Sequence, residues 1–228
     1  MADLRTQLAA NLAHVRERIT VACQQAGRSP FEVTLVAVTK YAQLEWIEGL
    51  IELGVMDLAE NRPQQLVERQ ARWPQVRWHL IGQLQRNKAK TVLGPAALIH
   101  SVDSLRLAER LSNLAETPQR ILCEVNVSGE ATKAGFTPTE LQESWDKLLA
   151  LPNLLVEGLM TMAPLSENPE DARPVFSELR QLRDLLQLRS PQSVSLSHLS
   201  MGMSGDYEVA IQEGATLVRV GSRLFEGL

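Results

Sequence analysis

The chain has 228 residues, of which 44% are hydrophobic, and its formal net charge at neutral pH is −4. This length allows one substantial core, and the charge excludes the strong basic excess that proteins use to bind nucleic acid. Apolar runs are too short to span a membrane, and the N-terminus lacks a signal-peptide core. Cys23 and Cys123 are too few and too far apart for a metal site or disulfide framework. We expect a soluble, cytoplasmic protein with one domain over residues 1–228.

The first expected element is an amphipathic helix over residues 4–24. Its apolar residues recur every three or four positions, at Leu4, Leu8, Leu12, Val15 and Ile19. Gly27 and Pro30 follow this pattern and end the helix.

After that helix, short apolar runs alternate with helical patterns. We expect strands at 33–39, 55–59, 76–82, 96–102, 120–128, 154–162, 194–199 and 215–221. Helices are expected at 43–53, 63–71, 84–93, 104–116, 138–150, 169–188 and 205–213. The fold class is therefore α/β, and the alternation predicts a closed (β/α)8 TIM barrel with an extra N-terminal helix. A doubly wound open sheet is the alternative, but the chain has no GxGxxG or GxxxxGK[ST] loop.

In such a barrel, functional residues lie at the C-terminal ends of the strands. Amines, amides, guanidinium groups and small residues predominate there, whereas paired carboxylates are absent. The four histidines are scattered and form no HxH or HExxH motif, which argues against a metal hydrolase.

Lys40 ends the first predicted strand, VTLVAVTK at 33–40. A lysine that points into the mouth of a barrel can form a Schiff base if its amine is desolvated or lies near another cation. The simpler interpretation is an ordinary solvated lysine at the end of a strand.

Small polar residues follow the seventh and eighth predicted strands, at Ser200, Met203, Ser204, Gly221 and Ser222. In barrels the loops after these two strands commonly hold a phosphate group, and small residues let the backbone approach it. Ordinary turn chemistry explains each residue separately, but not their clustering at one end. A phosphate site next to an amine on the first strand suits pyridoxal 5′-phosphate (PLP).

Arg219 stands two residues before Gly221 and therefore points to the same side of its strand. A guanidinium remains cationic, and beside the pyridine nitrogen of PLP it would keep that nitrogen unprotonated. The alternative is a buried ion pair with Glu60 or Glu124.

These motifs together resemble the YggS/PROSC family of pyridoxal phosphate homeostasis proteins, from about residue 33 to the C-terminus. The matching segments are VAVTK (36–40), AENR (59–62), WHLIGQLQRNK (78–88), HSVD (100–103), NVSGEATKAGF (126–136), EGLMTMAP (157–164), SMGMSGD (200–206) and VRVGSRLF (218–225). The resemblance implies a fold similar to the barrel domain of alanine racemase.

The resemblance also implies roles for individual residues. Lys40 would hold PLP as a covalent aldimine, Asn61 would lie near its 3′-oxygen, and Arg219 would face the pyridine nitrogen. The phosphate would be held by Ser204, Gly221 and Ser222, with Ser200 and the backbone around Met203. His79 and Met160 would line the pocket. Tyr41 departs from the pattern of many relatives, and its role stays open.

Racemisation requires two bases on opposite faces of the substrate carbon, and barrel racemases take the second base from an additional C-terminal domain. We expect no such β domain here, and only Tyr41 could replace its base. The prediction is a monomeric, non-catalytic PLP protein that serves vitamin B6 homeostasis and supplies PLP-dependent apo-enzymes. A PLP-dependent amino-acid racemase or decarboxylase is the alternative. A class I aldolase-like barrel is more distant, with Glu60 as its only nearby carboxylate.

Overall fold

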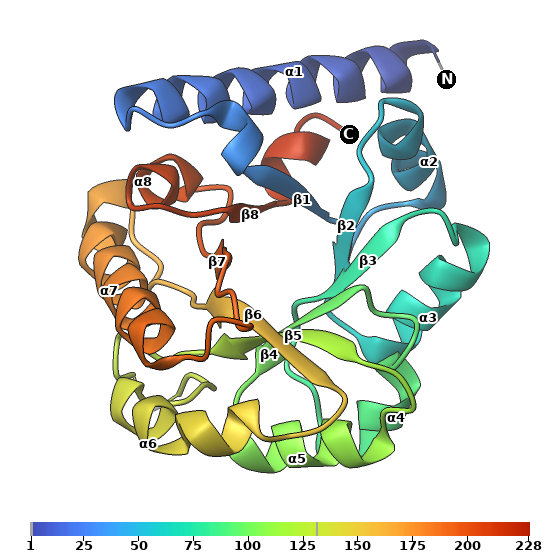
Figure 1. The fold of residues 1–228 in the computed structure, drawn as a ribbon. Coiled ribbons are helices and arrows are strands. Elements are labelled where there is room, and N and C mark those ends of the chain that lie inside the picture. The colour runs from blue at the N-terminus through green and yellow to red at the C-terminus, as the bar shows by residue number, and fades with distance from the viewer. Residues whose placement is uncertain (1, 131) are drawn as a thin grey trace.

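The computed structural model describes residues 2–130 and 132–228. Eight parallel strands form a closed barrel in chain order, and the last strand pairs with the first (Figure 1). The strands are β1 (Thr34–Val38), β2 (Asp57–Glu60), β3 (Arg77–Leu80), β4 (Leu98–Val102), β5 (Gln119–Glu124), β6 (Leu154–Met160), β7 (His198–Ser200) and β8 (Leu217–Val220). This arrangement confirms the predicted (β/α)8 barrel and excludes the open sheet.

Helices surround the barrel and cover the outer side of its strands (Figure 1). The α-helices are α1 (Ala2–Gln25), α2 (Leu44–Glu52), α3 (Pro63–Arg72), α4 (Ala89–Val92), α5 (Leu105–Leu114), α6 (Pro138–Leu149), α7 (Arg173–Arg189) and α8 (Tyr207–Gln212). Four 3-10 helices complete the described elements: η1 (Pro30–Glu32), η2 (Arg86–Lys88), η3 (Pro169–Ala172) and η4 (Ser222–Phe225). None of the described helices has the length and apolar character needed to cross a bilayer.

Alternate residues of each strand point inward and outward, so the barrel has two cores. The larger core lies between strands and helices, whereas a smaller apolar cluster fills the barrel interior. The interior cluster consists of Val36, Ala59, Leu98, Leu122, Met160 and Leu217. It forms the floor below the C-terminal end of the strands.

The N-terminal helix α1 lies outside β8 and β1, between α8 and α2 (Figure 1). Leu8 is fully buried there and lies against Gly49 of α2, where a Cβ would come within 2.7 Å of the Leu8 side chain. The Asn11 side chain donates hydrogen bonds to the carbonyls of Leu224 and Glu226. Helix α1 therefore holds the C-terminal segment against the barrel.

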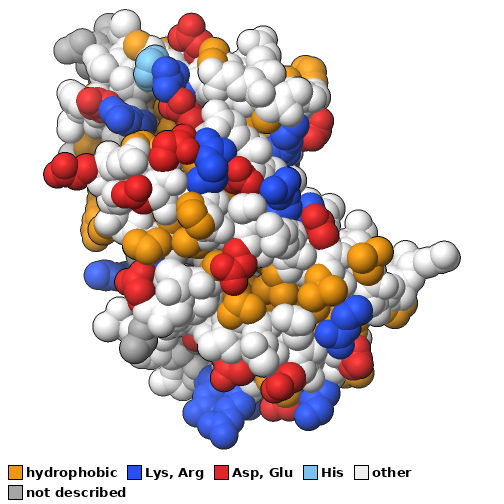
Figure 2. All heavy atoms as spheres, turned by 90° about the vertical axis from the view of Figure 1, so that its left-hand side faces the viewer, with side chains coloured by type: hydrophobic (Ala, Val, Ile, Leu, Met, Phe, Trp, Pro, Cys, Tyr) orange, Lys and Arg blue, Asp and Glu red, His pale blue; other side chains and the backbone are white. Residues whose placement is uncertain are grey.

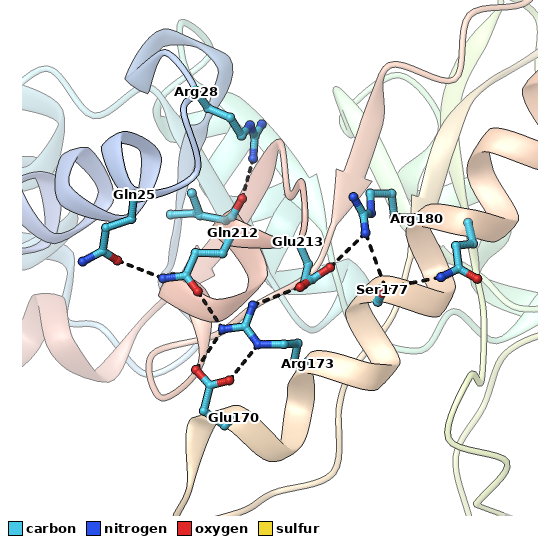
Figure 3. A network of polar contacts seen from close by, with 10 residues as sticks. Gln25, Arg28, Glu170, Arg173, Ser177, Arg180, Gln212 and Glu213 are labelled. Atoms are coloured by element: carbon cyan, nitrogen blue, oxygen red, sulfur yellow. Dashed lines mark hydrogen bonds and ion pairs between the residues drawn. The ribbon is translucent and has the colours of Figure 1, made fainter.

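On the surface that carries α7 and α8, acidic and basic side chains are intermingled, and hydrophobic side chains are exposed between them (Figure 2). A network of these groups joins the two helices: Arg173 binds Glu170 and Glu213, and Arg180 also binds Glu213 (Figure 3). Glu170 belongs to η3, so the network fixes the segment that follows β6. That segment forms part of the functional cavity described below.

Two strand predictions were wrong at their ends. The strand predicted at 120–128 ends at Glu124, because the chain then turns back and Phe136 donates its backbone N–H to the Glu124 carbonyl at 2.8 Å. The strand predicted at 194–199 is β7, which starts only at His198. The Leu196 backbone N–H is instead bound by the side chain of Gln187 on α7 at 2.7 Å.

Two helix predictions also need correction. The helix predicted at 84–93 consists of η2 and the short α4, since Gln85 is extended and Gly94 has a positive φ of 86°. The helix predicted at 169–188 begins as η3, and α7 starts at Arg173 with Pro174 in its first turn. Pro174 has no backbone N–H and is favoured at the start of a helix.

Candidate functional site

A cavity of about 740 Å³ opens at the C-terminal end of the barrel. This volume is typical of pockets for small molecules and cofactors. The segments after β1, β2, β6, β7 and β8 all contribute to its wall, as expected for a functional site in this fold. Of the predicted site residues, those on the wall are Lys40, Asn61, Met203, Ser204, Arg219, Gly221 and Ser222.

Lys40 is the second residue after β1 and lines the cavity. The preceding residue, Thr39, is buried and points away from the cavity, with its hydroxyl donating to Glu60 Oε1 at 2.7 Å. Alternation then turns Lys40 toward the interior. Its Nζ lies 5.2 Å from the ring centroid of Tyr41, which is 85% exposed at the entrance.

Glu60 does not line the cavity and is turned outward between the barrel and α3. Its Oε1 lies 3.8 Å from Nε of Arg69, and burial raises the pKa of its carboxyl group. A class I aldolase-like enzyme would need an acid/base carboxylate beside Lys40. The position of Glu60 therefore argues against that alternative.

Arg219 is 4% exposed and presents its guanidinium to the cavity from β8. It donates to Ser200 Oγ at 2.6 Å and to the Thr161 carbonyl at 2.9 Å. The described residues give it no ion pair with Glu60 or Glu124 within 4.0 Å, so the sequence-based alternative of a buried pair was wrong. Burial lowers the pKa of Arg219 to about 10, partly opposed by Asp206 and Glu124. The group is still a cation at neutral pH.

The loop after β7 and the start of η4 meet on the side of the cavity where the sequence predicted a phosphate site. The Gly221 backbone N–H donates to Ser204 Oγ at 3.2 Å, which joins the two segments. The Met203 backbone N–H donates to Asp206 Oδ1 at 2.6 Å and closes the loop before α8. A Cβ on Gly221 would lie 3.3 Å from Val38, so the backbone there is closely packed against β1.

Three predicted site residues lie below the cavity rather than on its wall. His79 is 5% exposed and binds His100 and Asp57 within the barrel, and Met160 belongs to the interior apolar cluster. Ser200 is fully buried and reaches the cavity only through Arg219. All three point inward as expected, but their positions along the strands place them one layer deeper.

Other wall residues do not lie at strand ends and were not predicted. Trp46 of α2 and Phe225 of η4 stack with their ring centroids 5.4 Å apart, and both line the cavity. Asp206 lines it from the loop before α8, and Pro169 from η3. Phe225 belongs to the segment VRVGSRLF, which resembles the family, and could have been predicted from it. Trp46 lies in a helix outside the matching segments, so no sequence motif indicated it.

Comparisons with known proteins show the family of this chain. The family model "Alanine racemase, N-terminal domain" matches residues 10–227. A pyridoxal phosphate homeostasis protein of Aquifex aeolicus is 45% identical over 219 residues, which cover 94% of this chain and 95% of that protein.

Two solved structures are also informative. PipY of Synechococcus elongatus PCC7942 with PLP bound has a TM-score of 0.83 at 34% identity, covering 96% of this chain and 99% of PipY. Alanine racemase of Clostridium difficile has a TM-score of 0.75 at 18% identity, and the match covers 96% of this chain but 56% of the racemase. The second likeness concerns the fold alone.

Proposed function

Because the chain belongs to the family of pyridoxal phosphate homeostasis proteins, with a barrel of the alanine racemase N-terminal type, we propose that it binds PLP in the cavity at the C-terminal end of its strands. The observation that carries this proposal is the composition of one wall. An amine, an amide and a buried guanidinium line the cavity together with the small residues Ser204 and Gly221.

These groups suit the chemistry of PLP. Lys40 would hold the aldehyde group of PLP through Nζ. Arg219 remains a cation and would face the pyridine nitrogen, and Asn61 would face the 3′-oxygen. The hydroxyls of Ser204 and Ser222 and the backbone around Met203 and Gly221 would hold the phosphate. PLP itself supplies an electrophilic carbon and an electron-withdrawing ring.

We propose further that the protein holds PLP without turning over amino acids. Two bases would be needed for racemisation, and Tyr41 is 85% exposed at the entrance. Tyr207, the other tyrosine, is buried in α8 and does not line the cavity. A donor-only guanidinium at the pyridine nitrogen also weakens the ring as an electron sink. That the protein is a cytoplasmic monomer and delivers PLP to apo-enzymes remains a prediction.

The test of binding is an absorption spectrum of the purified protein with PLP, followed by borohydride reduction and mass mapping. We expect the reduced adduct on Lys40 and none in Lys40→Ala. Lys90→Ala is the matched control, because Lys90 is exposed on α4 and does not line the cavity. A PLP adduct that persists in Lys40→Ala with the same spectrum would refute the assignment.

Turnover is tested separately with the PLP-loaded protein in deuterium oxide. We expect no exchange of the α-proton of L-alanine beyond that caused by free PLP. Exchange at a catalytic rate that disappears in Lys40→Ala would favour the racemase alternative instead.

A further inference from the structure

The interior of this barrel contains a line of polar side chains, of which the proposed function uses only Arg219. Asp57, His79, His100, Ser200 and Arg219 are connected one to the next by hydrogen bonds, and we call them the interior chain. Barrel interiors are normally filled with branched apolar residues, and unpaired polar groups there are costly. A continuous polar chain through such a core therefore requires an explanation.

The interior chain runs from one end of the barrel to the other. Asp57 begins β2 at the N-terminal end of the strands, where its partner Arg77 is more than half exposed. His79 Nε2 lies 3.2 Å from Asp57 Oδ1, and His79 Nδ1 lies 2.8 Å from His100 Nε2. His100 Nδ1 lies 2.8 Å from Ser200 Oγ, which accepts from Arg219 at 2.6 Å. Arg219 forms part of the cavity wall.

The two ends of the interior chain set the direction of its first and last hydrogen bonds. Arg219 can only donate, and ionised Asp57 can only accept. The pKa of Asp57 is held at about 2, against the effect of its burial, by hydrogen bonds from His79 and Arg77. One direction of donation, from Arg219 to Ser200, to His100, to His79 and finally to Asp57, satisfies every one of these contacts.

This direction assigns a donor and an acceptor nitrogen to each histidine. Each imidazole then donates with Nε2 and accepts with Nδ1. His100 is fully buried, and desolvation with the nearby Arg219 and His79 holds its pKa well below its usual range. The charged and titratable groups around the two rings are Asp57 (β2), Arg77 (β3), Arg120 (β5), Glu157 (β6), His198 (β7) and Arg219 (β8).

We infer that His79 and His100 are positioning residues for Arg219, which they hold through Ser200 in the orientation that faces the ligand. Ser200 can give its proton to His100 only while Nδ1 of that ring is unprotonated. Its oxygen lone pairs then remain directed at the guanidinium. The inference rests on the proposed function for the identity of the ligand, but the state of the interior chain is independent of it.

The first test uses the ligand-free protein labelled with ¹⁵N. The chain has four histidines, so their signals can be assigned by substitution. At pH 7 we expect the Nε2–H form for His79 and His100. A Nδ1–H form or a doubly protonated ring at either position overturns the inference.

The second test compares three variants by the Arg219 Nε–H resonance, the PLP dissociation constant and the absorption spectrum of bound PLP. His100→Leu removes both hydrogen bonds, and His100→Gln keeps an acceptor and a donor. His198→Leu is the control: it also replaces an inward-facing histidine, but His198 is partly exposed and pairs with Glu157 rather than with a residue of the interior chain.

We expect His100→Leu to shift the Arg219 resonance, weaken PLP binding about tenfold and change the spectrum. His100→Gln should stay within about threefold of the wild type, since it restores a hydrogen-bonded partner. The inference is overturned if His100→Leu and His198→Leu lose PLP affinity equally. It is also overturned if His100→Leu leaves the Arg219 resonance unchanged. Wild-type protein that binds no PLP refutes the proposed function, and the inference is then decided by the tautomers and the Arg219 resonance alone.

Discussion

At the scale of single residues, the barrel mouth combines a buried cation with a buried carboxyl group. Arg219 and Glu124 are each 4% exposed, and both lose hydration on folding. Burial raises the pKa of Glu124 to about 7, with Asp103 raising it further and Arg219 opposing the shift. Glu124 therefore changes its charge close to neutral pH, whereas Arg219 keeps its charge throughout.

The pKa of Glu124 predicts how the protein's stability depends on pH. Between its ordinary value of 4.5 and the value of about 7 in the fold, the folded protein retains a proton that the unfolded chain has released. The free energy of unfolding therefore falls as the pH rises through this interval. Glu124→Gln removes the ionisation and should stabilise the protein by roughly 1–3 kcal/mol at pH 8.

Urea denaturation at pH 4 and pH 8 measures this difference. At pH 4 the two proteins should be nearly equal in stability, since the wild-type carboxyl group is then mostly protonated in both states. Glu143→Gln, at an exposed position of α6, controls for the loss of one negative charge. A Glu124→Gln variant that is less stable at pH 8 would show that the carboxylate is stabilising in the fold.

The sequence predicted which side chains point into the barrel better than it predicted how far below the cavity they lie. Lys40 and Arg219 reach the cavity because the C-terminal ends of parallel strands converge. His79 and Met160 point inward too, but both are buried in the barrel interior and lie below the cavity floor. Strand register depends on contacts distant in sequence, and one sequence does not reveal it.

At the scale of elements, the loop after β7 depends on a glycine. Gly202 has a φ of 90°, and a Cβ there would lie 2.6 Å from Ala210 Cβ and 2.8 Å from Tyr207 Cα. Its carbonyl accepts from the Arg219 backbone N–H at 3.0 Å. The loop that carries Met203 and Ser204 is thus packed against both α8 and β8.

Gly202→Ala should destabilise the protein by about 2–4 kcal/mol, since it combines an unfavourable φ with steric overlap. Gly27→Ala is the matched control, because Gly27 also has a positive φ, of 65°, but a Cβ there would meet nothing within 4 Å. That control should cost about 1 kcal/mol. Thermal unfolding of both variants measures this difference in stability. Equal losses of stability would mean that the loop moves to accommodate the methyl group introduced by Gly202→Ala.

Most elements were predictable because their sequence patterns are local. Apolar runs marked β4 and β6, and Thr137 with Pro138 marked the start of α6, where a capping box is present. The short β7 was misplaced because its neighbour in space, Gln187 of α7, binds the preceding backbone. Interactions of this kind join residues that no local pattern connects.

At the scale of the whole molecule, α1 completes the outer layer of the barrel. The eighth strand is followed only by η4 among the described residues, and α1 covers the outside of β8 and β1 (Figure 1). The alternation of strands and helices predicted the barrel, and the amphipathic pattern predicted a helix at the N-terminus. The location of that helix could not be predicted, since its contacts with η4 and α8 join opposite ends of the chain.

The location of α1 links the stability of the barrel to the cavity. Its Asn11 binds the carbonyls of Leu224 and Glu226, and Phe225 between them stacks on Trp46 in the cavity wall. We therefore expect α1 to unfold together with the barrel and not before it. Leu8→Ala should lower the free energy of unfolding by about 2–5 kcal/mol, because Leu8 is fully buried between α1 and α2.

Circular dichroism and tryptophan fluorescence, followed in the same denaturant series, show whether α1 unfolds together with the barrel or before it. The four tryptophans lie outside α1, at Trp46, Trp73, Trp78 and Trp145, so their fluorescence reports on the barrel. If α1 belongs to the cooperative unit, Leu8→Ala shifts both curves to the same lower midpoint. Leu188→Ala, at a residue 86% exposed on α7, should leave both unchanged. A helical signal lost at lower denaturant than the fluorescence would show that α1 detaches from an intact barrel, and Phe225 would then need another anchor.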